Sequence, residues 1–250
     1  MGLSTLQKSN ITTGVNFASA ACGVQSHIGQ KNEHCLALDK QIDFFQEFIE
    51  ENLTKVIGVE QVPLHLSNSL VFISIGGNDF LNDLPNMVGP NRTLSAEDFG
   101  NHLVDELSNR LKRLYNLGGR KFLVNNVGPI GCLPTITYKF GGQCVEEINA
   151  LVVPYAKQLS VMLQQLQAQL PGSAFTGADS YKLFLNVIAN PESYGIPNAK
   201  TPCCPDGGNG SQICLPKAVP CTFRNYYLFF DQAHTTEVAN GVFARNCFSQ

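Results

Sequence analysis

Two kinds of hydrophobic pattern alternate along the chain and predict its secondary structure. Over residues 36–56 and 94–117, apolar side chains recur at helical spacing between charged ones, so both stretches are expected to form amphipathic helices. Residues 69–75 and 121–127 are instead nearly continuous apolar runs, which is typical of strands buried on both faces of a parallel sheet. The pattern in the first half of the chain therefore predicts helices that alternate with buried strands.

The second half continues this alternation. Residues 144–170 predict a long helical segment that Pro154 kinks or divides. Residues 173–179 predict a third strand, and residues 181–188 and 236–248 predict two further helices. Strands that alternate with helices predict an α/β sandwich with a mainly parallel sheet.

The composition fits one globular domain over residues 1–250. Hydrophobic residues make up 44% of the chain and charged residues 15%, and no repeat or clear linker divides it. A formal net charge of -3 without a basic run argues against nucleic acid as a partner. No stretch approaches the roughly 20 apolar residues of a membrane span, and no motif implies a metal or an organic cofactor. The oligomeric state stays open.

The cysteines indicate the compartment. There are nine, none with the C-x-x-C spacing of a structural zinc site, which predicts a disulfide framework in an oxidising environment with at least one thiol outside it. Cys203 and Cys204 are adjacent, so each is expected to pair with Cys214, Cys221 or a more distant cysteine. A short Cys132–Cys144 bridge is also conceivable, and the connectivity stays open.

Sequons support the same location. Four N-x-S/T triplets fit a secreted glycoprotein, although such triplets are common by chance. The N-terminus has no charged start followed by an apolar stretch, so no signal peptide is expected in this chain. The candidate glycosylation sites are Asn10, Asn52, Asn91 and Asn209.

Three short motifs are candidates for chemistry. The segment GVNFASAACG, residues 14–23, combines an apolar run with small residues that allow a backbone N–H to face a substrate, or simply close packing. GGND, residues 76–79, follows a predicted strand at the edge where α/β proteins bind ligands, or is an ordinary turn. Asp231 and His234 are three positions apart, so the carboxylate can orient the imidazole as a general base; a polar loop residue or a helix cap is the alternative for His234.

Taken together, the motifs carry a family resemblance. GVNFASAACG, IGGND, VGPIGCLP with CVEEIN, ADSY, CCPDGG and FFDQAHTTEVAN occur in the order found in plant GDSL-type esterase/lipases of the SGNH hydrolase superfamily, and they cover essentially the whole chain. The resemblance implies a three-layer, flavodoxin-like α/β sandwich and a secreted carboxylic ester hydrolase. Acyl or acetyl esters, either small molecules or lipids, would be the substrates.

The resemblance also implies roles for individual residues. Asp231 would orient His234, which would act as the base of a Ser-His-Asp mechanism. Asn78 would donate its side-chain amide to the oxyanion. The second oxyanion donor, a backbone N–H, aligns with Ala21, and Gly23 is the nearby glycine that is kept.

The nucleophile of this mechanism is missing. No G-D-S occurs in the sequence. Ser180 of ADSY falls where the family has its D-x-Y motif, so Ser180 is not expected to replace the missing serine. Ser4 and Ser19 have no motif support. The resemblance thus implies a family member without its first strand and its serine, with little esterase activity and, because the sheet would keep unpaired edges, low stability. The alternatives are a non-catalytic secreted binding protein of the same fold and a cysteine-rich structural module, which leaves Asn78, Asp231 and His234 without a shared role.

Overall fold

The computed structural model describes residues 12–29, 35–204 and 214–248. It divides into two compact units, and each is described by itself. Unit 1 comprises residues 1–125 and 157–177, and unit 2 comprises residues 126–156 and 178–250. The prediction of a single domain stays a prediction.

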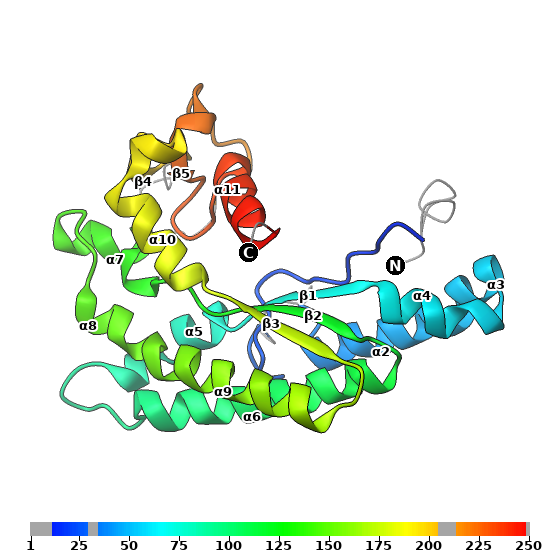
Figure 1. Cartoon of the computed structure of the whole chain (residues 1–250). Coiled ribbons are helices and arrows are strands. Elements are labelled where there is room, and N and C mark those ends of the chain that lie inside the picture. Colours follow the sequence, from blue (N-terminus) through cyan, green and yellow to red (C-terminus); the bar gives the residue numbers. More distant parts are fainter. Residues whose placement is uncertain (1–11, 30–34, 205–213, 249–250) are drawn as a thin grey trace. The chain divides into compact units, whose positions relative to one another are not determined.

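Unit 1 is built on a three-stranded sheet in the order β1-β2-β3, in which β1 pairs parallel with β2. Figure 1 shows α6 and α9 along one side of this sheet. The parallel pairing and the alternation of helices and strands confirm the predicted α/β class. The elements are α2 (Leu38–Phe48), η1 (Ile49–Leu53), α3 (Thr54–Ile57), η2 (Val59–Gln61), α4 (Val62–Asn68), β1 (Leu70–Ser74), α5 (Gly77–Met87), α6 (Ala96–Asn116), β2 (Lys121–Asn125), most of α9 (Val153–Gln169) and β3 (Ala174–Ala178).

Helix α6 carries much of the core of unit 1. Its N-cap is Ser95, whose Oγ accepts the N–H of Asp98 at 3.0 Å, and Gly118 with φ +112° follows its end. Its inner face buries Leu103, Leu107 and Leu111 completely, at i, i+4 and i+8.

Two arginines on α6 fix α2 against it. Arg110 Nη2 and Arg113 Nη1 reach the carboxylate of Asp39 at 2.7 and 2.8 Å, and Arg113 Nη2 reaches Asp43 at 2.8 Å. Arg110 is buried, so its charge requires these partners. Helix α2 is thus held by charge as well as by its apolar face.

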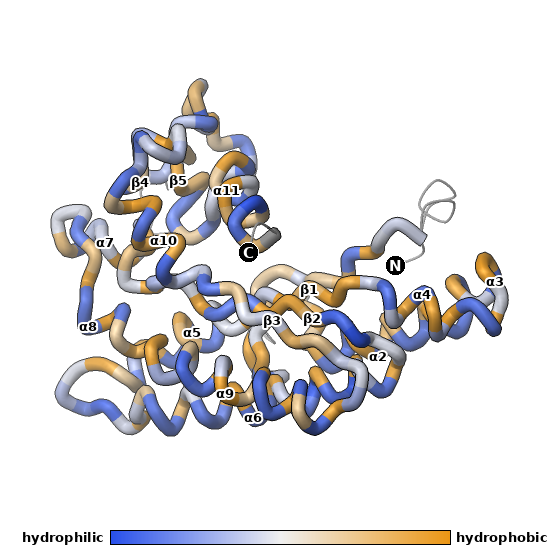
Figure 2. The backbone as a smooth tube through the Cα atoms, viewed as in Figure 1, coloured by the Kyte–Doolittle hydropathy of each residue, from blue (hydrophilic) through white to orange (hydrophobic). Residues whose placement is uncertain are grey.

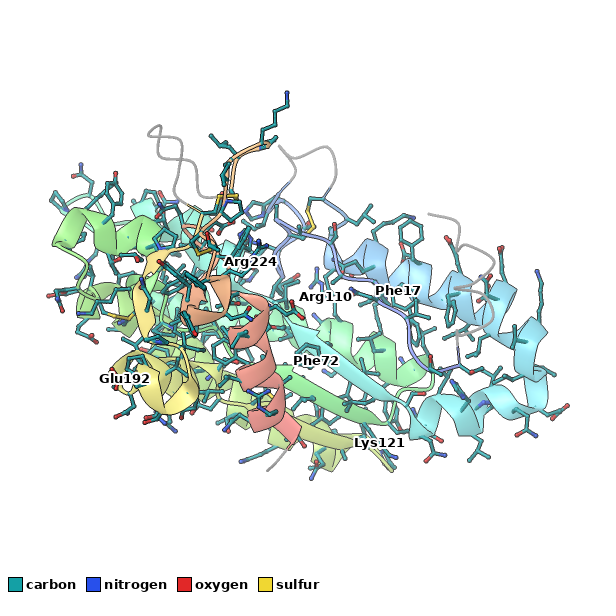
Figure 3. All side chains as sticks on the ribbon, turned by 90° about the horizontal axis from the view of Figure 1, so that it is seen from above. Phe17, Phe72, Arg110, Lys121, Glu192 and Arg224 are labelled. Atoms are coloured by element: carbon teal, nitrogen blue, oxygen red, sulfur yellow. A yellow bond between two sulfur atoms is a disulfide. The ribbon has the colours of Figure 1, made fainter. Side chains whose placement is uncertain are left out.

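Strand β1 corrects one prediction. Residues 69–75 were expected to be buried on both faces, but Leu70 and Phe72 are 46% and 55% exposed. Of the described strands, only β2 pairs with β1, so β1 lies at an edge of the sheet. Its tube has largely the hydrophobic colour in Figure 2, Figure 3 labels Phe72 on it, and the face that carries Leu70 and Phe72 is exposed. A continuous apolar run contains no period that reveals whether one or both faces are covered.

Unit 2 packs helices α10 and α11 around a two-stranded parallel sheet. Phe184 of α10 lies against Phe229 of β5 and Phe243 of α11, with ring centroids 5.6 and 5.4 Å apart. The elements are η3 (Ile130–Cys132), α7 (Pro134–Thr137), η4 (Tyr138–Phe140), α8 (Glu146–Asn149), η5 (Ala150–Val152), α10 (Ser180–Ala189), η6 (Pro191–Tyr194), β4 (Asn198–Pro202), η7 (Arg224–Tyr226), β5 (Tyr227–Phe229) and α11 (Glu237–Phe248).

The remaining predicted elements were found with small changes. The segment 144–170 is divided into α8, η5 and α9, and Pro154 is the second residue of α9, where its missing N–H breaks no helical bond. A π-helical turn, η1, interrupts the helix predicted over 36–56. The short strands β4 and β5 were missed: β4 ends in a proline followed by two cysteines, and β5 has only three residues, which is too short to show a strand pattern.

The described residues form four disulfides. Unit 1 holds Cys22–Cys35, and unit 2 holds Cys132–Cys144, Cys203–Cys221 and Cys204–Cys214. The predicted framework is therefore confirmed, and Cys247 belongs to none of these bridges.

The structure also locates two of the four sequons. Asn91 is exposed and Asn52 is half-buried within η1, whereas Asn10 and Asn209 lie outside the described residues, so glycosylation stays a prediction. Among the described helices, none is long and apolar enough to cross a membrane.

The open face of β1 predicts self-association. Phe72→Thr should lower the aggregation rate of the purified chain about twofold or more, because it removes exposed apolar area from an edge strand but keeps a residue suited to strands. The free energy of unfolding should change by less than about 0.5 kcal/mol. Light scattering and urea unfolding measure these quantities. Val56→Thr, at a helical position of 54% exposure, is the control; an equal effect of both changes would contradict a role for the strand edge.

Candidate active site

The loop that carries Asp231 and His234 connects β5 to α11. Its ends are fixed because Phe230 N–H donates to His234 O at 2.8 Å and Thr236 N–H donates to Leu228 O at 3.0 Å. The Thr236 hydroxyl donates to Tyr227 O at 2.6 Å and accepts the Ala239 N–H at 3.2 Å, so it caps α11. The acid and the histidine therefore lie on a short loop clamped at both ends.

Asp231 and His234 form the predicted pair. His234 Nδ1 lies 2.9 Å from both carboxylate oxygens of Asp231. The Asp231 side chain is almost fully buried, whereas that of His234 is 63% exposed. A carboxylate at Nδ1 keeps the proton on that nitrogen and leaves Nε2 to accept a proton from a reactant. The geometry is that of an oriented general base.

Backbone N–H groups keep Asp231 ionised. Burial raises the pKa of this carboxyl, but donors from Ala233 at 3.0 Å and His234 at 2.7 Å, together with the His234 ring, outweigh burial and hold the pKa below its usual range. The N–H of Cys214 donates to Oδ2 at 3.2 Å. Because the folded pKa is depressed, the carboxylate stabilises the fold above its unfolded pKa, and this contribution is lost as pH falls through the folded pKa.

Two disulfides tie the preceding segment to this loop. Cys203 and Cys204 follow β4, and their N–H groups donate to Phe229 O at 3.0 Å and to Phe230 O at 2.6 Å. The bridge from Cys204 to Cys214 holds the residue whose N–H reaches Asp231. Sequence reasoning predicted the bridge as one possibility but not this hydrogen bond, because nothing in the sequence connects Cys214 to the carboxylate.

The oxyanion candidates lie in unit 1. Gly76 adopts φ +117° at the end of β1, so the chain turns directly into α5, whose second residue is Asn78. Asn78 Nδ2 donates to Cys22 O at 2.9 Å. The structure therefore joins GGND to the loop of residues 14–23 through two residues that are 56 positions apart in the sequence.

Asp79 is a residue that sequence reasoning left without a role. Its side chain is fully buried and accepts the N–H groups of Val24 at 2.8 Å and Gln25 at 3.0 Å. A Cβ atom on Gly23 would overlap the Asp79 carboxylate, so this position requires glycine. Burial raises the pKa of Asp79, and the hydrogen bonds from Gln25 and Val24 offset only part of that rise. In the sequence, this role of Asp79 was indicated by its position in the GGND motif.

Ala21 has a left-handed backbone with φ +64°. This conformation is one that favours glycine over residues with a side chain. The next residue, Cys22, is bridged to Cys35, and Ser19 Oγ accepts the Leu36 N–H at 2.9 Å. The loop that holds Ala21 and Gly23 is thus fixed by a disulfide, by Ser19 and by Asp79.

Ser180 has the surroundings of a helix start rather than of a nucleophile. It is the first residue of α10, after the N-cap Asp179, whose Oδ1 accepts the Lys182 N–H at 3.1 Å and Asn126 Nδ2 at 3.0 Å. Among the described residues, no group of three or more His, Cys, Asp and Glu could hold a metal ion.

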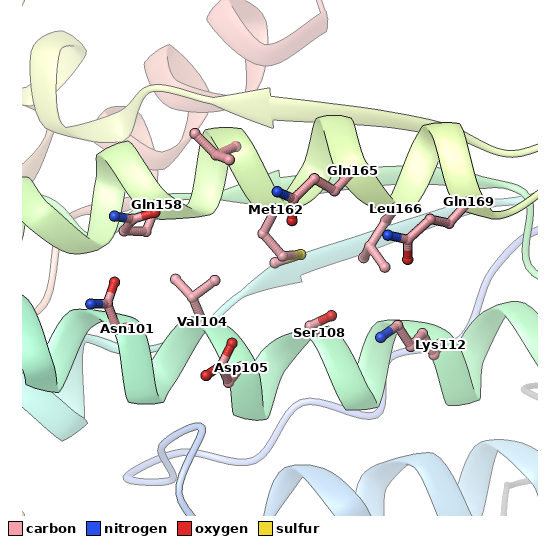
Figure 4. Close-up of a pocket in the computed structure, with 11 residues that line it drawn as sticks. Asn101, Val104, Asp105, Ser108, Lys112, Gln158, Met162, Gln165, Leu166 and Gln169 are labelled. Atoms are coloured by element: carbon pink, nitrogen blue, oxygen red, sulfur yellow. The ribbon is translucent and has the colours of Figure 1, made fainter.

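A pocket of about 470 Å³ lies elsewhere, between α6 and α9 (Figure 4). None of the predicted site residues lines it, and its lining contains no histidine. Amide and hydroxyl side chains dominate the wall, including those of Asn101, Ser108, Gln158, Gln165 and Gln169. The pocket therefore differs from the candidate active site.

The fold and these groups define a class and a family. The chain is an α/β protein with a parallel sheet and a carboxylate-oriented histidine after its last strand. The model of the GDSL-like lipase/acylhydrolase family matches residues 1–246, so the chain belongs to that family.

Plant proteins are among its relatives. GDSL esterase/lipase At1g71691 of Arabidopsis thaliana is 36% identical over 243 residues, which cover 96% of this chain and 63% of the relative. GDSL esterase/lipase 7 of the same plant is 35% identical over 249 residues, covering 96% of this chain and 68% of the relative. The chain thus spans about two thirds of the length of these proteins.

The first site prediction concerns Asp79. Asp79→Ala should lower the free energy of unfolding by about 2 kcal/mol, because the N–H groups of Val24 and Gln25 lose their acceptor. Urea unfolding measures this change. Asp83→Ala, on the same helix but with only an exposed hydrogen bond to Asn86, should cost less than about 0.5 kcal/mol. Equal losses in the two variants would show that Asp79 does not hold the loop.

The second site prediction concerns Ala21. Ala21→Gly should raise the free energy of unfolding by about 0.5–1 kcal/mol, because relief of the left-handed strain exceeds the added backbone entropy of glycine. Thermal unfolding gives the comparison. The matched change Ala156→Gly, inside α9, should instead destabilise by about 1 kcal/mol. The strain argument fails if Ala21→Gly destabilises as well.

Proposed function

We propose that this chain supplies the general base and the oxyanion-binding groups of a GDSL-type carboxylic ester hydrolase. The observation that carries the proposal is the contact of His234 Nδ1 with both oxygens of the buried Asp231 at 2.9 Å. Membership of the GDSL-like lipase/acylhydrolase family and the names of its relatives support an ester as substrate. Acyl or acetyl esters are the proposed class.

In the proposed reaction a serine hydroxyl attacks the ester carbonyl while His234 Nε2 takes its proton. Asp231 holds the opposite nitrogen and stabilises the imidazolium that forms. The imidazolium then gives the proton to the departing alcohol, and a water molecule, activated in the same way, releases the acid and restores the serine. No metal or organic cofactor enters these steps.

The tetrahedral oxyanion would be bound by N–H groups of unit 1. The Asn78 side chain has two N–H bonds, of which one donates to Cys22 O. The second N–H is proposed to donate to the oxyanion, together with the backbone N–H of Ala21 or Gly23. The bond to Cys22 fixes the orientation of the amide, so its remaining N–H is directed before a substrate binds.

The serine is not among these residues. No G-D-S motif occurs in the 250 residues, so the complete reaction is proposed for a polypeptide that also supplies one. The four disulfides support an extracellular location for this protein, because such bridges persist in oxidising compartments.

Hydrolysis of p-nitrophenyl acetate tests the proposal. The 250-residue chain is compared with a version preceded by the G-D-S segment of a GDSL relative, and only the longer version should hydrolyse the ester. In that version His234→Ala should lower kcat by about 10⁴ or more. Asn78→Ala should lower kcat by about 10²–10³, because one oxyanion donor is lost.

His102→Ala, at an exposed position on α6, is the matched control and should leave kcat unchanged. If the longer version is active but insensitive to His234→Ala, the assignment of the base is wrong. If the 250-residue chain alone hydrolyses the ester in a His234-dependent way, a nucleophile within it has been overlooked.

A further inference from the structure

Unit 2 exposes a group of apolar side chains on the loop from Cys214 to Tyr226, which we name the stapled loop. Val219 is 86% exposed and Phe223 67% exposed, the highest values among the described large hydrophobic residues, and Tyr226 is 54% exposed. Single exposed apolar residues are normal on a protein surface, but here three lie within eight positions of one loop, and two of them, Phe223 and Tyr226, are in contact with each other.

The local structure of the stapled loop keeps these side chains exposed instead of allowing them to pack against the rest of unit 2. Cys221 is bridged to Cys203, and its N–H donates to Cys203 O at 2.8 Å. A turn closes with the Ala218 N–H on Leu215 O at 3.0 Å. The rings of Phe223 and Tyr226 stack on each other at a centroid distance of 6.0 Å. Their exposure is therefore built into the local structure.

The charge of the stapled loop is entirely positive. Lys217 and Arg224 are exposed, and Figure 3 labels Arg224 on this segment. The sequence contains no acidic residue from Cys214 to Phe230, and neither cation forms an ion pair with a described residue. The chain as a whole has a net charge of -3, so this loop differs from the average surface.

Aliphatic, aromatic and cationic side chains on one short rigid loop match the layers of a lipid surface. Valine is suited to the hydrocarbon, phenylalanine and tyrosine to the boundary with the head groups, and lysine and arginine to phosphates. A single-stranded nucleic acid would use the rings and the cations but would gain nothing from Val219, the most exposed of these residues. The combination therefore favours lipid.

We propose that the stapled loop docks this protein on a lipid–water interface that carries anionic head groups. The loop begins at Cys214, whose N–H reaches Asp231, and it runs into β5, which leads to the same aspartate. Docking would thus bring the loop of Asp231 and His234 next to the lipid surface. The binding itself does not depend on the ester hydrolysis proposed above.

Vesicle flotation with the 250-residue chain tests this proposal. We expect binding to vesicles of phosphatidylcholine with phosphatidylglycerol, and weaker binding to phosphatidylcholine alone. Phe223→Ser combined with Tyr226→Ser should weaken binding to both by about tenfold or more, because the rings no longer enter the interface. Lys217→Gln combined with Arg224→Gln should weaken only binding to the anionic vesicles, by about fivefold per cation.

A second aromatic pair provides the control. Tyr138 and Phe140 are 66% and 54% exposed, and Lys139 between them lies 5.6 Å from the Tyr138 ring. Tyr138→Ser combined with Phe140→Ser should leave binding unchanged, and circular dichroism verifies that every variant is folded. The proposal is overturned if the unaltered chain binds neither vesicle, or if the control pair loses as much binding as Phe223 and Tyr226. The vesicle assay does not depend on hydrolysis of p-nitrophenyl acetate. Lipid docking and ester hydrolysis can therefore each be disproved without the other.

Discussion

Both motif loops depend on a buried carboxylate that accepts backbone N–H groups. In unit 2, Asp231 gathers three such donors as well as the His234 ring, and in unit 1, Asp79 gathers two. A loop that carries chemistry has few apolar contacts to hold it, and its N–H groups need acceptors wherever water is excluded. One carboxylate meets this need for several residues at once and gives the loop a single conformation.

In unit 2, disulfides fix the conformation of a segment that would otherwise need a larger hydrophobic core to hold it. Within the segment from Asn198 to Tyr226, the described residues, 198–204 and 214–226, contain one five-residue strand and one three-residue helical turn, yet the segment must support the histidine loop. The bridges Cys203–Cys221 and Cys204–Cys214 restrict its unfolded conformations and fix its two ends on β5 and on Asp231. The segment can therefore present polar and exposed apolar residues without losing its shape.

The sequence predicted those features that depend on local pattern. The helix over residues 94–117, the division of a helix at Pro154 and the proximity of Asp231 to His234 all follow from residues within a few positions of one another. The open face of β1 could not be predicted, because exposure depends on what packs over a strand. The same holds for the Cys214 N–H on Asp231 and for the role of Asp79, which require partners 17 and about 55 residues away.

The two carboxylates respond to acid in opposite ways. Asp79 has a raised pKa, so its protonation favours the folded chain, and ionisation costs stability as pH rises through its unfolded and then its folded pKa. Asp231 has a lowered pKa and keeps its charge, and hence its hold on His234, until the medium is more acidic than an ordinary aspartate requires. Mild acidification thus removes the cost of burying a charge at Asp79, while Asp231 stays ionised and keeps its hydrogen bonds. On acidification Asp79 is therefore protonated before Asp231, and the contact between Asp231 and His234 is the more acid-resistant of the two arrangements.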